Sequence, residues 1–172
     1  MAKLIKNRDI VEDNWKVLTL AANETPETVR LPAGPVLVPL GVWQARKLDL
    51  IQREWEHGDA LGVWLDPKDN PADIAADLDD FSVVAVSFPL ATDGRGYSIA
   101  TLLRTRYGFR GELRAIGAVG RDHIHYLHRV GFDAFAIAEP ELAVVGLADF
   151  SETYQAAANQ PLPLFRRRAA IA

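Results

Sequence analysis

The sequence has 172 residues, of which 49% are hydrophobic and 24% are charged, and its formal net charge is −4. This length is enough for one domain with a substantial core, since a domain usually takes about 100–200 residues. The chain has no cysteine, which excludes disulfides, thiolate zinc sites, thiol nucleophiles and cysteine-ligated iron–sulfur clusters. No run approaches the roughly 18 apolar residues of a membrane span, and acidic residues follow the N-terminus too early for a secretory signal. We therefore expect a cytoplasmic protein with no membrane partner.

The first 35 residues differ from the rest of the chain and predict an N-terminal extension. Residues 3–5 and 16–20 are short apolar segments, which we expect to pair as a β-hairpin or to cover one edge of a sheet. Residues 21–35 are polar and contain proline, so they predict a loop.

The central part of the chain alternates short apolar runs with longer amphipathic segments. The apolar runs predict strands at 36–40, 61–65, 82–88, 112–116 and 134–138. The amphipathic segments predict helices at 44–56, from 71 onward, and at 97–107, 123–130, 142–147 and 151–157, the last with Ser151 as its N-cap. In the first of these helices Leu48, Ile51 and Trp55 recur about one turn apart, so we expect this face to pack against the core.

Strands that alternate with helices indicate βαβ units and a mostly parallel sheet. We predict an α/β fold: a single domain over residues 1–160, with a core of about five βα units over 36–158. A small open sheet and a half-barrel-like sheet both fit this pattern. Residues 161–172 contain two prolines and three arginines without clear periodicity, which predicts a flexible, extended tail.

Charge is distributed unevenly along the chain. Residues 91–130 hold seven arginines and three acidic residues, whereas residues 59–80 hold seven acidic residues and one lysine. We interpret the acidic segment as a solvated face. Nucleic-acid binding normally requires a basic domain, so the balance argues against a nucleic-acid partner and favours a local anion site or an acidic partner.

The loop after the third predicted strand carries the sharpest local signal, DGRGYS at 93–98. In parallel α/β folds, ligands bind beyond the carboxyl ends of the strands. Gly94 and Gly96 would let the backbone approach a ligand, and Arg95 and Ser98 at the start of the next helix would bind an anion. The loop is neither a Walker A nor a GxGxxG motif. A tight strand-to-helix turn with Asp93 as its cap explains the same residues without a ligand.

Two more arginines extend this candidate anion site. Arg114 lies on the fourth predicted strand and Arg121 follows the end of that strand. Guanidinium groups are suited to carboxylate, phosphate, sulfite or sulfate. The alternative is that the three arginines form ordinary ion pairs with acidic neighbours, namely Asp93, Glu112 and Asp122.

The candidates for proton transfer beside such an anion are Asp93, Asp122 and His123. His125 and His128 lie one turn apart, but no third ligand has matching spacing, so we predict no metal site. The chain has no serine-nucleophile elbow and no flavin or haem signature, so we predict no cofactor. We expect the four tryptophans to be core or edge residues.

Residues 88–137 resemble the characteristic segment of a bacterial protein family of unknown function. The resemblance rests on DGRGYS at 93–98, LLR at 102–104, RYG at 106–108, GELRA at 111–115, RD at 121–122 and GFDAF at 131–135. Genes of this family typically lie beside assimilatory sulfite reductase and other cysteine-biosynthesis genes. Its members are often labelled probable oxidoreductases of sulfite reduction, so the resemblance implies a pathway rather than a defined reaction.

Three functions follow as hypotheses. The first is a cytoplasmic accessory protein that contacts sulfite reductase or another cysteine-biosynthesis enzyme, with the tail around 165–168 as a candidate docking element. The second is a small α/β enzyme or binding protein for an anionic metabolite, which uses the 93–98 loop with Arg95, Arg114 and Arg121. The third is a regulatory module that senses a sulfur metabolite. A second copy of the chain, pairing at an exposed sheet edge, is a further candidate partner.

Overall fold

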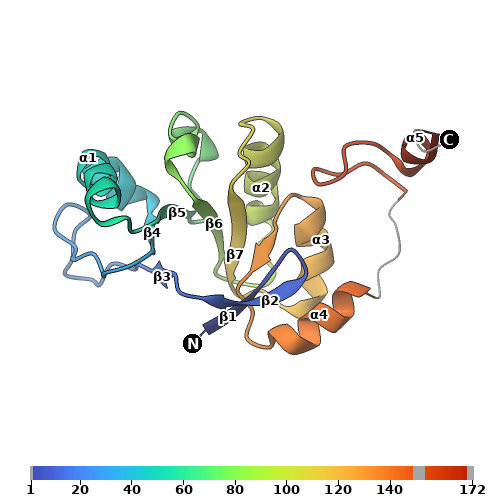
Figure 1. The fold of residues 1–172 in the computed structure, drawn as a ribbon, viewed down its shortest axis with the longest axis horizontal. Coiled ribbons are helices and arrows are strands. Elements are labelled where there is room, and N and C mark those ends of the chain that lie inside the picture. Colours follow the sequence, from blue (N-terminus) through green and yellow to red (C-terminus); the bar gives the residue numbers. More distant parts are fainter. Residues whose placement is uncertain (1, 149–153, 170–172) are drawn as a thin grey trace.

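The computed structural model describes residues 2–148 and 154–169, whose strands form one eight-stranded sheet in the order β2-β1-β8-β7-β6-β5-β4-β3 (Figure 1). Parallel strands make up its centre: β4 (Val36–Pro39), β5 (Leu61–Leu65), β6 (Val83–Phe88), β7 (Glu112–Gly117) and β8 (Ala134–Phe135). The five predicted strands correspond to these five, and the predicted mostly parallel α/β fold is confirmed.

The N-terminal residues supply both edges of the sheet. Strands β1 (Ala2–Lys6) and β2 (Asp9–Asp13) form an antiparallel hairpin, and β1 also pairs with β8. Strand β3 (Lys16–Val17) instead runs parallel to β4 at the opposite edge. The hairpin is therefore confirmed, but its second strand is 9–13 rather than 16–20.

The sheet is a curled half-barrel because β2 and β3 are separated by only two residues. Asn14 and Trp15 join the two strands, and such a connection spans only about 10 Å even when it is extended. Two strands at opposite edges of an eight-stranded sheet can be this close only if the sheet curls until its edges approach each other. The structure thus shows the half-barrel and not the open sheet.

The helices follow one another around the outside of the curl (Figure 1). They are α1 (Leu40–His57), α2 (Arg95–Thr105), α3 (Ile124–Arg129) and α4 (Pro140–Ala148), with short 3-10 turns at Pro71–Ile74, Leu78–Asp80 and Arg121–His123. No helix within residues 2–148 and 154–169 is long and apolar enough to cross a membrane.

Side chains that alternate along each strand build two hydrophobic clusters on the two faces of the sheet. On β6, Val84, Val86 and Phe88 belong to the large cluster beneath the helices, whereas Val83 and Ala85 belong to a smaller one on the other face. Trp15, from the connection between β2 and β3, packs against this smaller cluster. The inside of the curl is therefore covered by the same short connection that forces the sheet to curl.

The predicted core-facing side of the first helix is right for Ile51, which packs against the core, and wrong for Leu48 and Trp55. Leu48 and Trp55 are 81% and 87% exposed, whereas Trp43 and Leu50 are each 1% exposed. Arg46 interrupts α1 with non-helical backbone angles, φ −133° and ψ 29°. Because the helix is rotated at this kink, one periodic apolar face does not continue through it, and Leu50 rather than Leu48 turns toward the core.

The C-terminal part of the chain forms an arm that extends away from the sheet (Figure 1). Residues 151–153, including the predicted N-cap Ser151, lie outside the described residues, and 154–157 form a bend and a β-bridge in place of the predicted helix. Residues 164–169, expected to be extended, form helix α5 (Leu164–Ala169), whose first backbone N–H donates to the Tyr154 carbonyl at 3.0 Å. The predicted flexibility of this arm stays a prediction.

Asp77 connects α1 to the acidic segment 59–80. Its carboxylate accepts hydrogen bonds from Lys47 Nζ and, at 2.8 Å, from Trp43 Nε1. The bond from Lys47 lowers the pKa of the Asp77 carboxyl below its ordinary value, and the Trp43 N–H acts in the same direction, against the opposing effect of burial.

We expect the contribution of Asp77 to stability to be complete above the pKa of the unfolded chain and to be lost as pH falls through the lower pKa of the folded chain. Asp77→Asn should lower the free energy of unfolding by about 1 kcal/mol at pH 7 and by less at pH 3. Urea unfolding at both pH values measures this. The exposed Asp79→Asn variant is the control, and an equal loss for Asp77→Asn at both pH values would contradict the assignment.

Candidate functional site

Asp93 and Arg95 form an ion pair with three hydrogen bonds at the start of α2. Asp93 Oδ1 accepts hydrogen bonds from the Arg95 backbone N–H at 3.1 Å and from its Nε at 3.0 Å, while Oδ2 accepts from Nη2 at 2.7 Å. The Arg95 side chain is the main cause that lowers the pKa of the Asp93 carboxyl, and the backbone bond adds to it. The carboxylate of Asp93 thus occupies the place at the N-terminus of α2 that an anionic ligand would take.

The two glycines of this loop have different roles. A Cβ on Gly96 would lie 2.5 Å from the Phe88 ring, so Gly96 is required for α2 to pack on β6. A Cβ on Gly94 would meet nothing within 4 Å, so Gly94 leaves the loop open to solvent. Ser98 is exposed in the first turns of α2.

The neighbouring loop, between β7 and α3, carries the other predicted residues of this edge. It lies beside the first loop because the Ala118 N–H donates to the Phe88 carbonyl at 2.7 Å. His123 Nδ1 accepts the Gly120 N–H at 3.1 Å, which fixes the proton of a neutral imidazole on Nε2. Arg121 and Asp122 are exposed in the same turn.

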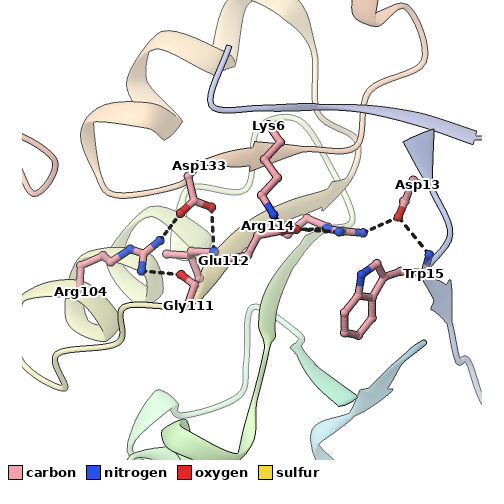
Figure 2. A network of polar contacts seen from close by, with 9 residues as sticks. Lys6, Asp13, Trp15, Arg104, Gly111, Glu112, Arg114 and Asp133 are labelled. Atoms are coloured by element: carbon pink, nitrogen blue, oxygen red, sulfur yellow. Dashed lines mark hydrogen bonds and ion pairs between the residues drawn. The ribbon is translucent and has the colours of Figure 1, made fainter. Parts of the chain in front are cut away.

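Arg114 lies apart from both loops, on the inside of the curl, and is 3% exposed. Figure 2 shows its guanidinium between two carboxylates. Nε and Nη2 contact Glu112 Oε1 at 2.7 and 2.6 Å, and Nη1 donates to Asp13 Oδ1 at 2.9 Å. Asp13 also accepts the Trp15 N–H at 3.1 Å, and Lys6 Nζ pairs with Glu112 Oε2 at 2.7 Å. Arg114 therefore fastens the N-terminal edge of the sheet to β7.

A second, partly buried network fastens the end of α2 to the sheet (Figure 2). Arg104 donates through Nε to the Gly131 carbonyl at 2.8 Å, through Nη1 to the Gly111 carbonyl at 2.9 Å, and through Nη2 to Asp133 Oδ2 at 2.8 Å. Asp133 Oδ1 accepts the Leu113 N–H at 2.9 Å. Burial lowers the pKa of Arg104 and raises that of Asp133, and the charge of each partner opposes both shifts. Both groups hold the fold together.

These contacts show where the predicted anion-binding and proton-transfer residues lie. The structure brings the residues of the 93–98 loop together with Arg121, Asp122 and His123 at the carboxyl edge of β6 and β7, and it places Arg114 elsewhere. The alternative ion pairs of Arg95 with Asp93 and of Arg114 with Glu112 are present. Anion binding by these residues, and proton transfer by Asp93, Asp122 or His123, stay predictions.

The histidines of α3 form no evident metal site. Among residues 2–148 and 154–169, no group of three or more His, Asp or Glu side chains is placed to hold a metal ion. His128 Nδ1 lies 3.2 Å from the Phe132 carbonyl, and the His125 ring lies edge-on to Tyr126 at 5.3 Å. Burial, followed by the charges of Arg129 and His128, lowers the pKa of His125.

We expect Arg114→Ala to lower the free energy of unfolding by about 3 kcal/mol or more, because it leaves the buried carboxylates of Glu112 and Asp13 without their shared cation. Arg95→Ala is the matched control: its side chain is 61% exposed, and its removal should shift the unfolding midpoint little. Urea unfolding of both variants measures this. Equal losses for the two variants would show that Arg114 does not fasten the curl.

We expect Gly96→Ala to lower the free energy of unfolding by about 1–3 kcal/mol, because the new methyl group forces the Phe88 ring or α2 to move. Gly94→Ala should be close to neutral, since its Cβ meets open space. Thermal unfolding of the two variants measures this. A loss for Gly96→Ala alone shows that this glycine is required for packing, and not only for the approach of a ligand. A Gly96→Ala protein as stable as the original would contradict the packing role.

The networks around Arg104 and Arg114 include residues of the motifs quoted from the sequence. Arg104, Gly111, Arg114 and Asp133 belong to the LLR, GELRA and GFDAF motifs. No curated protein matches the sequence. The profile of a bacterial protein of unknown function, DUF934, matches residues 62–165, which is more than half of the chain. The chain therefore belongs to the DUF934 family of bacterial proteins.

Proposed function

We propose that this chain is a cytoplasmic accessory protein of assimilatory sulfite reduction that acts by contacting sulfite reductase or another enzyme of cysteine biosynthesis. The resemblance carried by the 93–135 motifs supports the pathway. The observation that supports contact as the mode of action is the pair of exposed apolar side chains on α1, Leu48 and Trp55.

Leu48 and Trp55 lie on the outward side of α1, two turns apart, with Gln52 exposed between them. With exposed fractions of 81% and 87%, both large apolar side chains are almost fully accessible to a partner. Burial of such side chains against a partner is favourable at roughly 25 cal/mol per Å², and tryptophan is prominent among the residues that dominate binding energy at protein interfaces. This surface is suited to a partner with an apolar pocket.

The C-terminal arm offers a second contact surface at the other end of the molecule (Figure 1). Phe165 is 55% exposed, its ring centroid lies 6.3 Å from that of Tyr154, and the Arg166 guanidinium lies 6.0 Å from the Phe165 ring. Arg167 and Arg168 follow directly. An aromatic side chain beside three arginines is suited to an acidic partner surface.

The alternative function, binding or conversion of an anionic metabolite at the 93–98 loop, has less geometric support. Asp93 already contacts both Nε and Nη2 of Arg95, and Arg114 is buried between Asp13 and Glu112. An anion at the loop would have to displace the Asp93 carboxylate from the start of α2. The contact function requires no such rearrangement.

We expect the purified protein to bind purified sulfite reductase, or a second purified enzyme of cysteine biosynthesis, in a titration followed by calorimetry. The double variant Leu48→Ser and Trp55→Ser should weaken this binding at least tenfold, because it removes the exposed apolar pair. Deletion of residues 161–172 should weaken it further at low ionic strength, where the arginines act most strongly.

Leu142→Ser is the matched control, since Leu142 is 58% exposed on α4, away from both surfaces. Circular dichroism checks that each variant is folded. No binding to any enzyme of the pathway would contradict the proposed function. Binding that is unchanged in the double variant would show that α1 is not the contact surface.

A further inference from the structure

A groove of about 600 Å³ lies between α2, α3 and residues 156–158 of the C-terminal arm. Its volume falls within the range of sites that hold small organic molecules, about 300–1,000 Å³. It lies outside α1 and the exposed face of α5, so it is independent of the surfaces on which the proposed function rests.

The α2 wall of the groove consists of Tyr97, Thr101 and Thr105, which recur every four residues along one helix face. The two threonine hydroxyls donate back into their own helix: Thr101 Oγ1 to the Tyr97 carbonyl at 2.9 Å and Thr105 Oγ1 to the Thr101 carbonyl at 2.7 Å. Since their hydrogens are used in this way, this wall offers a ligand mainly an aromatic ring and methyl groups.

The wall that the C-terminal arm contributes is short, apolar and held in place by backbone hydrogen bonds. Ala156, Ala157 and Ala158 line the groove. The Ala158 N–H donates to the Arg129 carbonyl at 3.0 Å, which attaches this wall to the end of α3. The backbones of Ala157 and Gln160 exchange hydrogen bonds at 2.9 and 3.0 Å, so a tight turn holds the wall in shape.

Arg129 supplies the charge in this otherwise apolar groove. It lines the groove, and its Nε is buried without a hydrogen-bond partner. Within residues 2–148 and 154–169, no carboxylate forms an ion pair with its guanidinium. Arg104 and Arg114, by contrast, are both held by carboxylates. With no carboxylate of the described residues beside it, the guanidinium charge of Arg129 is available to an oxyanion bound in the groove.

We propose that this groove binds a small organic anion, whose apolar body lies between α2 and Ala156–Ala158 and whose carboxylate, sulfonate or phosphate pairs with Arg129. The apolar walls select the body of the ligand, and the single cation selects its charged group. The Tyr126 side chain, 58% exposed, stands at the rim.

The test uses two fluorescent probes of similar shape and different charge: 8-anilinonaphthalene-1-sulfonate, which carries a sulfonate, and neutral N-phenyl-1-naphthylamine. We expect the sulfonate probe to bind at one saturable site of the full-length protein. Arg129→Met should weaken its binding at least tenfold and should leave the neutral probe nearly unchanged. Arg106→Met is the control, because Arg106 is exposed and does not line the groove.

A second variant, Thr101→Trp, fills the groove and should abolish binding of both probes. Arg129→Gln replaces Arg129→Met if circular dichroism shows the latter to be unfolded. Displacement of the sulfonate probe by benzoate, benzenesulfonate or phenyl phosphate identifies the preferred oxyanion. The proposal is overturned if the sulfonate probe does not saturate, if neutralising Arg129 leaves its affinity unchanged, or if it still binds when Thr101→Trp fills the groove, since it then adsorbs to exposed apolar side chains elsewhere.

Discussion

The connection of Asn14 and Trp15 between two strands at opposite edges is the constraint on which the rest of the structure depends. It curls the sheet, places the Trp15 ring over the inner face, and brings Asp13 within hydrogen-bond distance of Arg114 on β7. A Cβ on Gly62 of β5 would meet the Val83 carbonyl oxygen at 2.5 Å, the Leu37 side chain at 2.6 Å and the Trp15 ring at 3.2 Å, so the inner face is tightly packed here. The cover of the inner face by Trp15 and the buried Asp13–Arg114 pair are consequences of this one short segment.

The central elements could be predicted from the sequence because local patterns determine them. Continuous apolar runs specify parallel strands covered on both faces, and Gly58, Gly108 and Gly131 adopt the positive φ expected where helices end. The sequence predictions are wrong where tertiary structure overrides the local sequence pattern. The kink at Arg46 reverses the expected exposure of Leu48, and β2 consists of mostly polar residues whose strand conformation depends on β1.

In the candidate site too, local contacts could be predicted from the sequence and long-range contacts could not. The Asp93–Arg95 pair lies within three residues, and the sequence suffices to suggest it. The Asp13–Arg114 pair spans 101 residues, and no spacing rule reveals it. The LLR, GELRA and GFDAF segments carry parts of two ion-pair networks, one buried around Arg114 and one partly buried around Arg104. A buried arginine that loses its carboxylate is strongly destabilising, so a motif of this kind can specify a fold without specifying a reaction.

The position of β1 has a consequence for synthesis of the chain on the ribosome. Residues 2–6 are made well before their partner strand β8, which consists of residues 134–135. Until β8 emerges, the β1 side of the hairpin is unpaired as well as the β2 side, and a two-stranded hairpin alone is marginally stable in water. The half-barrel can therefore close only after residue 135 has been translated, and its strands β1 and β2 are among the last to pair with the rest of the sheet.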